Sequence, residues 1–347
     1  MNLFYASTAY HVLLSYIIAV SDCNNENNAL LLMGNSAANK TQQLFQQLFP
    51  SAFTKIVILE SYPDHNNFKR LCVRKKNLRE IKSLIEELCP IDKFYYTCDW
   101  KVEVNYISHL LQNTGTKFHY YDDGMATYMR SYKPSSAIAE VVGKCFYGKW
   151  RVVPKAEGRL NKNTHIHAIL PELLPDIYEE KVKCKIDPSR MFATLKTENF
   201  PDDLMKYTGQ PIELLLALPR TDRINDAFIA IMQQQIKALE KNSVVIAMKK
   251  HPRTLANDPV IQKLNADGNI IDLPTEYPAE LYYLLLSKSL KKIIGTTSTA
   301  MMTAKMLIPN VDISVIYTQE SIRADGVAQK SFKLFEKMGI KLQEIVE

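Results

Sequence analysis

Short apolar runs alternate with longer amphipathic stretches over the first 125 residues of the chain. A short apolar run between polar residues predicts a strand that is buried on both faces, and an amphipathic stretch predicts a helix. Their alternation is typical of β-α units around a parallel sheet. The predicted strands are residues 2–7, 29–34, 55–60, 92–98 and 117–121, and the predicted helices are 9–20, 68–88 and 102–112.

The pattern weakens between residues 126 and 205 and then returns as a second series. Strands are predicted at 212–219, 243–252, 269–274 and 291–299, and helices at 225–241, 278–289 and 298–308. We therefore predict an α/β fold of GT-B type, with two Rossmann-like domains facing a central cleft at the carboxyl ends of their strands. The predicted parts are a first domain at 1–205, a linker at 206–211, a second domain at 212–330 and a C-terminal helix at 331–347.

Length and composition agree with two packed domains. The 347 residues are 46% hydrophobic and 23% charged, which excludes a collagen-like or broadly disordered chain. The formal net charge is +6. Such an excess fits an anionic ligand or an acidic membrane surface, but it is too small to require nucleic acid as the partner.

The six cysteines lie far apart and form no C-x-x-C pair, which predicts reduced thiols in the cytoplasm. The N-terminal stretch has no basic region or cleavage site of a signal peptide, and its apolar runs are too short to span a bilayer. The segment 330–347 carries lysines and an apolar face. We expect it to pack on the first domain or, alternatively, to lie peripherally on the inner membrane.

Two adjacent carboxylates and a glycine, Asp122-Asp123-Gly124, follow the predicted strand 117–121. The charge of one carboxylate can raise the pKa of its neighbour, which suits a general base that takes a proton from a sugar hydroxyl. Gly124 permits a tight turn and close approach of a substrate. The alternative is an ordinary turn, for which Asp-Asp-Gly is a common sequence.

A basic loop follows the predicted strand at 243–252. It contains Lys249, Lys250, His251, Pro252 and Arg253. A histidine fixed by the following proline and flanked by cations suits a phosphate group, which it can neutralise or protonate as a general acid. The alternative is a solvated basic turn.

Two further segments follow strands of the second domain. Thr296, Thr297 and Ser298 open a helix, where hydroxyls and backbone N–H groups make an anion site. Glu280 falls in the first turn of a helix that Pro278 can begin, where its carboxylate can accept hydrogen bonds from ribose hydroxyls. The alternatives are an N-cap for the hydroxyls and a surface carboxylate for Glu280.

Several enzyme classes are disfavoured by absent motifs. The sequence has no G-x-G-x-x-G, Walker loop or G-x-S-x-G, which counts against dinucleotide oxidoreductases, NTPases and α/β-hydrolases. His165 and His167 share one face of a predicted strand, but no Cys or carboxylate nearby in sequence completes a metal site. We predict no metal and no cofactor.

The motifs resemble those of bacterial GT-B sialyltransferases. That family has a D/E-D/E-G motif in the first domain, a His-Pro motif in the second and a Ser/Thr motif further on. Here they stand as Asp122-Asp123-Gly124, His251-Pro252 and Thr296-Thr297-Ser298. The opening sequence MNLFYASTAYHVLL is similar to that of glycosyltransferase family 52 and polysialyltransferase-like proteins.

This resemblance implies an inverting, metal-independent transfer of sialic acid from CMP-sialic acid to a terminal sugar, in the first place a galactoside. The acceptor would be a bacterial surface glycan, either lipooligosaccharide or capsule. Asp122 or Asp123 would deprotonate the acceptor hydroxyl and His251 would assist departure of the CMP phosphate. Asp222 is a reserve base, because family 52 relatives can take their base from the start of the second domain.

The donor-binding set implied by the resemblance is larger than the three motifs. It consists of Gly124, Arg220, Lys250, Pro252, Arg253, Glu280, Thr296, Thr297 and Ser298. Arg220 follows the first strand of the second domain, where it can contact phosphate or the sialyl carboxylate. Ser7 and Thr8 follow the first strand of the chain and face the same cleft, although capping the helix at 9–20 is the alternative role.

Three neighbouring hypotheses stay open. The same motifs fit a polysialyltransferase or a transferase of another nonulosonic acid. A sugar-nucleotide epimerase of similar two-domain build is a different class of enzyme. A noncatalytic glycan- or nucleotide-binding protein is the third.

Overall fold

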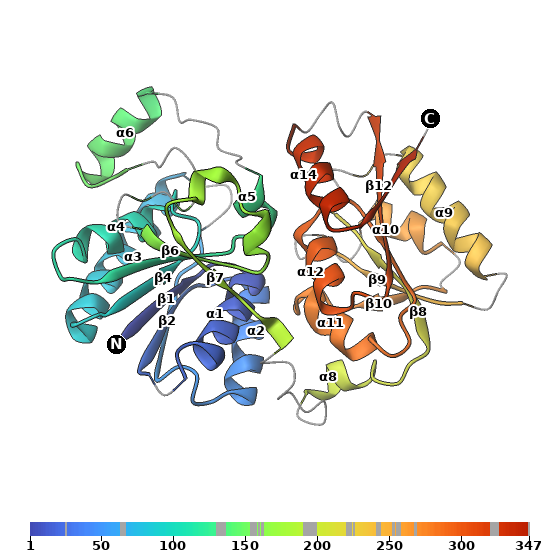
Figure 1. Ribbon diagram of the computed structural model, residues 1–347, viewed down its shortest axis with the longest axis horizontal. Helices are drawn as coiled ribbons and strands as arrows, with labels where there is room; N and C mark the ends of the chain where they lie inside the picture. Colours follow the sequence, from blue (N-terminus) through green and yellow to red (C-terminus); the bar gives the residue numbers. More distant parts are fainter. Residues whose placement is uncertain are drawn as a thin grey trace. The chain divides into compact units, whose positions relative to one another are not determined.

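The chain folds into two compact units, Met1–Leu195 and Lys196–Glu347 (Figure 1). Residues 196–211, expected in the first domain and the linker, therefore belong to the second unit. The computed structural model describes residues 1–24, 26–62, 67–129, 137–152, 158, 160, 163–189, 200–219, 224, 226–240, 244–251, 254, 258–266, 269–319 and 326–345.

The first unit is built on a parallel seven-stranded sheet with the order β3-β2-β1-β4-β5-β6-β7. Its strands are β1 (Asn2–Ala6), β2 (Asn28–Met33), β3 (Lys55–Leu59), β4 (Lys93–Tyr96), β5 (Lys117–Tyr121), β6 (Asn163–Ala168) and β7 (Val182–Lys185). The order reverses at β1, which is the topological switch point where open α/β sheets bind ligands. The predicted α/β class is confirmed.

Helices connect these strands. They are α1 (Ala9–Ser21), α2 (Ser36–Leu48), α3 (Asn67–Leu88), α4 (Val102–Leu110), α5 (Met125–Tyr128) and α6 (Ala137–Tyr147). Short 3₁₀ turns at Pro171–Leu173 and Asp176–Tyr178 lie between β6 and β7. Because crossovers between parallel strands are right-handed, α1 and α2 cover one face of the sheet and α3 and α4 the other (Figure 1).

The second unit has a parallel six-stranded sheet with the order β10-β9-β8-β11-β12-β13. The strands are β8 (Ile212–Ala217), β9 (Val245–Lys249), β10 (Ile271–Leu273), β11 (Lys292–Gly295), β12 (Asp312–Thr318) and β13 (Lys341–Ile345). The helices are α8 (Asp202–Met205), α9 (Asp226–Glu240), α10 (Pro259–Leu264), α11 (Ala279–Leu286), α12 (Thr299–Leu307) and α14 (Gly326–Lys337). Here the order reverses between β8 and β11, so the second unit also has a switch point.

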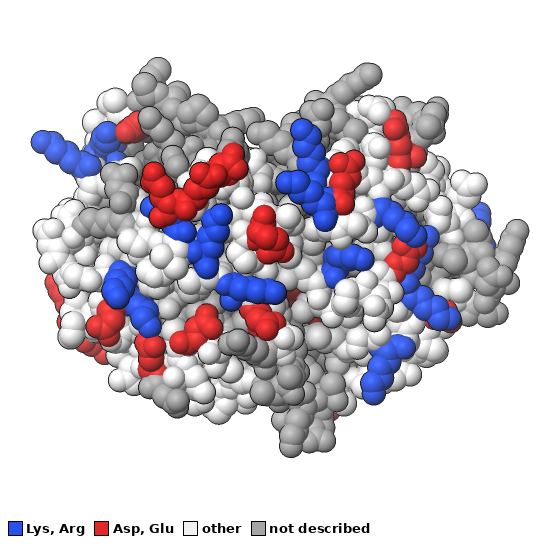
Figure 2. Space-filling view, viewed as in Figure 1, with Lys and Arg blue, Asp and Glu red and all other residues white. Residues whose placement is uncertain are grey.

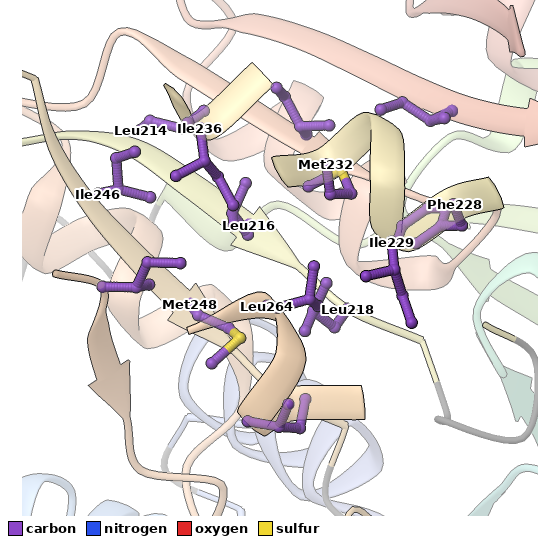
Figure 3. Close-up of a cluster of buried hydrophobic side chains, with 14 residues drawn as sticks. Leu214, Leu216, Leu218, Phe228, Ile229, Met232, Ile236, Ile246, Met248 and Leu264 are labelled. Atoms are coloured by element: carbon purple, nitrogen blue, oxygen red, sulfur yellow. The ribbon is translucent and has the colours of Figure 1, made fainter. Parts of the chain in front are cut away.

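Burial of apolar strand residues against amphipathic helices holds the second unit together. Leu214, Leu216 and Leu218 pack with side chains from α9 and α10 in one continuous cluster (Figure 3). Met232 of α9 is fully buried in this cluster. At roughly 1.5–3 kcal/mol for each fully buried apolar side chain, the cluster is a principal source of this unit's stability.

The C-terminal segment differs from the sequence-based expectation. Only residues up to Lys337 are helical, and Lys341–Ile345 form the edge strand β13, paired in parallel with β12. Gly339 stops the helix because it adopts φ +69°, a conformation that favours glycine, and the N–H of Ile340 donates to the carbonyl of Phe335. The prediction of a helix through residue 347 is therefore wrong for 341–345.

Basic and acidic side chains are interspersed on the face shown in Figure 2, at least where its residues are described. On the described part of that face, the lysines and arginines do not form one continuous basic patch, although the chain has a net charge of +6. Among the described residues, every helix is too short or too polar to cross a membrane.

Candidate functional site

The Asp-Asp-Gly motif forms the sharp turn between β5 and α5. β5 ends at Tyr121, and α5 begins at Met125. Gly124 has φ +70°, which a residue with a side chain rarely adopts, so the turn requires this glycine. The two carboxylates of the motif consequently lie in different environments.

Asp122 is fully buried and holds the turn together. Its Oδ1 accepts the N–H of Gly124 at 2.7 Å, while its Oδ2 accepts the N–H of Ile169 at 3.3 Å and the hydroxyl of Tyr128. Burial raises the pKa of Asp122 to about 7 despite these three donors. This carboxylate links the end of β5 to the segment after β6 and has no path to solvent.

Asp123 is the accessible member of the pair, with 15% of its side chain exposed. Its Oδ1 lies 2.6 Å from Nε2 of His11, and its Oδ2 accepts the thiol of Cys98 at 3.0 Å. Burial raises the pKa of Asp123, but the charge and hydrogen bond of His11, the Cys98 hydrogen bond and the charge of Lys101 outweigh it. The pKa of Asp123 therefore lies below its ordinary value, and the carboxylate is ionised at neutral pH.

His11 is fixed from its other side by the segment after β1. Its Nδ1 lies 3.1 Å from the hydroxyl of Ser7, and only 2% of its side chain is exposed. Thr8 is the N-cap of α1, because its hydroxyl accepts the N–H of His11 at 3.1 Å. Of the two predicted residues after β1, Thr8 thus caps the helix, whereas Ser7 contacts the imidazole.

Sequence reasoning missed both partners of Asp123. The sequence pattern predicts His11 only as part of an apolar helix and Cys98 only as the end of a strand, although a histidine among apolar residues is a signal of a polar contact. Cys98 has φ +51°, a rare conformation for a residue with a side chain, and it brings the thiol to the carboxylate. Ser7, Cys98 and Asp123 follow β1, β4 and β5, the strands at the switch point of the first sheet.

The side chains of His11, Cys98 and Asp123 also offer a nitrogen, a sulfur and an oxygen within 4.8 Å of one another. Within the described parts of the chain this is the only such trio of potential metal ligands. Zinc accepts this mixture of donors. In the structure the three groups satisfy one another by hydrogen bonding.

His165 and His167 both lie in β6, as predicted, and join a third histidine of β5. Nε2 of His167 lies 2.9 Å from Nδ1 of His119, and the ring of His165 stacks on His119 with centroids 4.2 Å apart. Burial lowers the pKa of His119 to about 2 and that of His167 to about 3. The imidazoles of His119 and His167 are neutral and lie in the interior of the first unit.

In the second unit, the basic loop begins inside the protein. Lys249 is 5% exposed, and its Nζ donates to the carbonyls of Lys250 at 3.2 Å and Thr275 at 3.5 Å. Burial lowers the pKa of Lys249 to about 8. Nζ of Lys250 lies 2.5 Å from Oδ2 of Asp272, so the loop is not a freely solvated turn.

His251 lies two residues after the end of β9 and is partly exposed. Glu280 lies in the first turn of α11, and its Oε1 accepts the hydroxyl of Thr303 at 2.7 Å. Burial raises the pKa of Glu280. Because β9, β10 and β11 are parallel members of one sheet, the segments that follow them meet at its carboxyl edge.

The hydroxyl motif follows β11 at that same edge. Thr296, Thr297 and Ser298 are all partly exposed. Ser298 occupies the N-cap position of α12, yet its side chain makes no capping hydrogen bond. Its hydroxyl therefore does not serve the cap that the alternative interpretation assigned to it. Gly295 lets β11 approach β8, since a Cβ there would lie 2.6 Å from the carbonyl oxygen of Ala217.

Four predicted site residues, Arg220, Asp222, Pro252 and Arg253, lie outside the described residues. The described site residues fall into two groups, one in each unit. One set, at the switch point of the first unit, contains Ser7, His11, Cys98 and Asp123. The other, at the carboxyl edge of the second sheet, contains His251, Glu280 and the three hydroxyls.

A family model described as alpha-2,8-polysialyltransferase (POLYST) matches residues 2–317. No protein with a curated description matches the chain. The match confirms the resemblance to polysialyltransferase-like proteins that the sequence motifs indicated.

Solved structures share the fold. UDP-GlcNAc 2-epimerase from Methanocaldococcus jannaschii is 16% identical with a TM-score of 0.55, covering 97% of this chain and 92% of that one. The Neisseria meningitidis UDP-GlcNAc 2-epimerase bound to UDP-GlcNAc is 12% identical with a TM-score of 0.53, covering 97% and 91%. The glycotransferase of kitacinnamycin is 12% identical with a TM-score of 0.51, covering 99% and 86%. These similarities confirm the predicted GT-B fold.

Proposed function

The chain belongs to the alpha-2,8-polysialyltransferase family and is a glycosyltransferase, and from that premise we propose that it transfers sialic acid from CMP-sialic acid to a bacterial surface glycan. The proposed reaction is a single displacement with inversion and without a metal. The observation that carries the proposal is the difference in environment between Asp122 and Asp123. Of these two carboxylates, only Asp123 is both ionised and exposed to solvent. A general base must be unprotonated and must reach the hydroxyl that it activates.

In the first unit, Asp123 accepts the proton of the acceptor hydroxyl. The hydroxyl oxygen then forms a bond with the anomeric carbon of the sialyl group, while the bond from that carbon to the phosphate oxygen breaks. His11 does not contact the substrate in this proposal, because it is 2% exposed. It orients the carboxylate of Asp123 and keeps its pKa low.

In the second unit, His251 and the hydroxyls of Thr296, Thr297 and Ser298 receive the phosphate of CMP. Hydroxyls and a histidine at a carboxyl edge can stabilise the charge that develops on a departing phosphate. Glu280, held by Thr303, accepts hydrogen bonds from the ribose. Arg220, Lys250, Pro252 and Arg253 stay assigned to the donor, and Asp222 stays the reserve base.

Two versions of the proposal differ in the sugar that accepts the sialic acid. The family description names an alpha-2,8 linkage, which favours a terminal sialic acid as the acceptor. The motifs alone favoured a galactoside of lipooligosaccharide or capsule. Parallel assays with a sialylated lactoside and with lactoside itself distinguish the two acceptors.

The decisive experiment measures CMP release from CMP-sialic acid in the presence of EDTA. We expect turnover with the sialylated acceptor, and its loss in Asp123→Asn and in His251→Ala. Full activity in either variant contradicts the residue assignment. Activity that is lost in EDTA and restored by zinc would instead assign His11, Cys98 and Asp123 to a metal.

A second candidate is a sugar-nucleotide epimerase, which the fold of the two epimerase structures favours. Such an enzyme converts a UDP-sugar without any acceptor. Incubation of the protein with UDP-GlcNAc alone, followed by NMR of the sugar, tests this function directly. We expect no conversion.

A further inference from the structure

Arg74 of α3 is held between two tyrosine rings in the first unit. Its Cζ lies 4.7 Å from the ring centroid of Tyr62 and 5.4 Å from that of Tyr147. Its Nη1 donates to the hydroxyl of Tyr147 at 2.5 Å, and its Nε donates to the hydroxyl of Tyr62 at 3.3 Å. Stacking and hydrogen bonding together fix the plane of the guanidinium.

The charge of this guanidinium is incompletely balanced. Among the described residues, the only carboxylate paired with Arg74 is Glu103, whose Oε1 lies 3.8 Å from Nε. Glu103 is 1% exposed and also accepts the hydroxyl of Tyr62, and burial raises its pKa to about 7. At neutral pH the carboxyl is therefore partly protonated, and much of the positive charge of Arg74 stays available.

Donor groups of Arg74 also stay available. Nη2 donates to none of the described residues, and the side chain is 20% exposed. Arg70, one turn earlier in α3, lies 5.7 Å from the Tyr62 centroid and is itself exposed. Two guanidiniums thus border the same tyrosine ring. A planar guanidinium with free N–H donors is well matched to a carboxylate.

The cluster of Arg74, Tyr62, Tyr147 and Glu103 lies in the same unit as the residues around Asp123, and Tyr5 relates the two groups. Glu103 is in the first turn of α4, the helix that begins shortly after Cys98. The buried hydroxyl of Tyr5, at the end of β1, interacts electrostatically with Glu103, Cys98 and Arg74 alike. Both groups of side chains therefore lie at the carboxyl edge of the first sheet.

We propose that Arg74 binds the carboxylate of the terminal sialic acid of the acceptor and so selects sialylated over neutral acceptors. This inference rests on the proposed sialyl transfer. The guanidinium is held in place before the substrate arrives, so little side-chain freedom is lost on binding. Arg74 is a binding residue in this role, and Tyr62 and Tyr147 are its positioning residues.

The test compares Arg74→Gln and Arg74→Lys with Arg79→Gln, a matched change at an exposed arginine of the same helix. The acceptors are a sialylated lactoside and the same compound with its carboxylate reduced to an alcohol. For the wild type and Arg79→Gln, we expect reduction to raise the acceptor KM at least tenfold. In Arg74→Gln the KM for the sialylated lactoside should already be raised to that extent, and it should be the same for the acceptor whose carboxylate is reduced to an alcohol. Arg74→Lys should give KM values between those of the wild type and Arg74→Gln.

Hydrolysis of CMP-sialic acid without acceptor reports on folding and on the donor site, and we expect the matched control Arg79→Gln to hydrolyse it at the wild-type rate. The proposal is overturned if Arg74→Gln keeps the wild-type KM, or if it still responds to carboxylate reduction as the wild type does. If the wild type releases no CMP with any acceptor, the proposed function fails on its own. Direct binding of the sialylated lactoside, measured by calorimetry, then decides on Arg74, because it should weaken in Arg74→Gln and not in Arg79→Gln.

Discussion

Nε2 of His11 and Oδ1 of Asp123 lie 2.6 Å apart, although 112 residues separate them in the chain. α1 carries the histidine, and the turn after β5 carries the carboxylate. The parallel sheet brings these two segments to one edge, because β1, β4 and β5 are consecutive in its order. This contact distinguishes Asp123 from Asp122 and gives the two carboxylates of one motif separate tasks.

Replacement of Asp123 by Asn should abolish the proposed transfer without unfolding the protein. The amide keeps the shape of the carboxylate but cannot accept a proton, and loss of a general base costs on the order of 10²–10⁴-fold in kcat. Steady-state CMP release with the sialylated acceptor measures the loss. A variant that retains more than a tenth of wild-type kcat would assign the base elsewhere, with Asp222 as the next candidate to replace.

Replacement of Asp122 by Asn should instead lower stability. An amide places its NH₂ group against at least one of three donors, the N–H groups of Gly124 and Ile169 and the hydroxyl of Tyr128. An unsatisfied buried polar group costs about 1–3 kcal/mol. Urea unfolding followed by circular dichroism should show a lower midpoint than for Asp123→Asn, and the opposite ranking would reverse the assigned roles.

Replacement of His11 by Ala should move the acidic limb of the pH profile. His11 lowers the pKa of Asp123, and the base is active only above that pKa. When the histidine is removed, the pKa of Asp123 rises, so the midpoint of the acidic limb of kcat/KM should move to higher pH. The Ser7→Ala variant, which keeps the imidazole, should show a smaller shift. Identical acidic limbs in the His11→Ala variant and the wild type would contradict the role of His11.

Most strands of the sheets could be predicted from the sequence because a strand buried on both faces is a nearly continuous apolar run. The residues NLFYA of β1 and IELLLA of β8 show this pattern. The edge strand β13 does not, since three of the five residues of KLQEI are polar and its two apolar residues stand three apart, a spacing that predicts helix. The polar helix α2 escaped prediction for a similar reason, because few of its residues are apolar.

The motif residues of the site could also be predicted, but their partners could not. Asp-Asp-Gly after a strand predicts a functional turn, whereas the choice between adjacent carboxylates depends on which one the fold buries. That choice is set by Tyr128 and Ile169 on one side and by His11 and Cys98 on the other. Contacts over such sequence separations depend on strand order, which a single sequence does not reveal.

Replacement of Thr303 by Val should weaken donor binding selectively. The hydroxyl of Thr303 donates to the buried carboxylate of Glu280 at 2.7 Å and helps to keep it charged, because this bond lowers the pKa that burial raises. Without it, the pKa of Glu280 rises further, and a neutral carboxyl is a weaker acceptor for ribose hydroxyls. We expect the KM for CMP-sialic acid to rise several-fold with the acceptor KM unchanged. An equal rise in both KM values would count against a ribose contact.

Stability should fall steeply between pH 7 and pH 5 because of the histidines at the centre of the first unit. Burial lowers the folded-state pKa values of His119 and His167 to about 2 and about 3, whereas the unfolded chain takes up protons near the ordinary value of about 6.5. A depressed histidine pKa gives stability that is present above pH 6.5 and is lost as the pH falls below it. Each of the two histidines should therefore lower the free energy of unfolding by about 2 kcal/mol between pH 7 and pH 5.

The double replacement of His119 and His167 by Leu isolates this effect. It removes both imidazoles of the 2.9 Å contact, so no buried ring nitrogen remains without its hydrogen-bond partner from that contact. Urea midpoints at pH 7 and pH 5 should differ by much less in the double variant than in the wild type, while other titrating groups contribute equally to both. An undiminished pH dependence in the double variant would show that the histidines are already protonated in the folded protein, and that their burial does not keep them neutral.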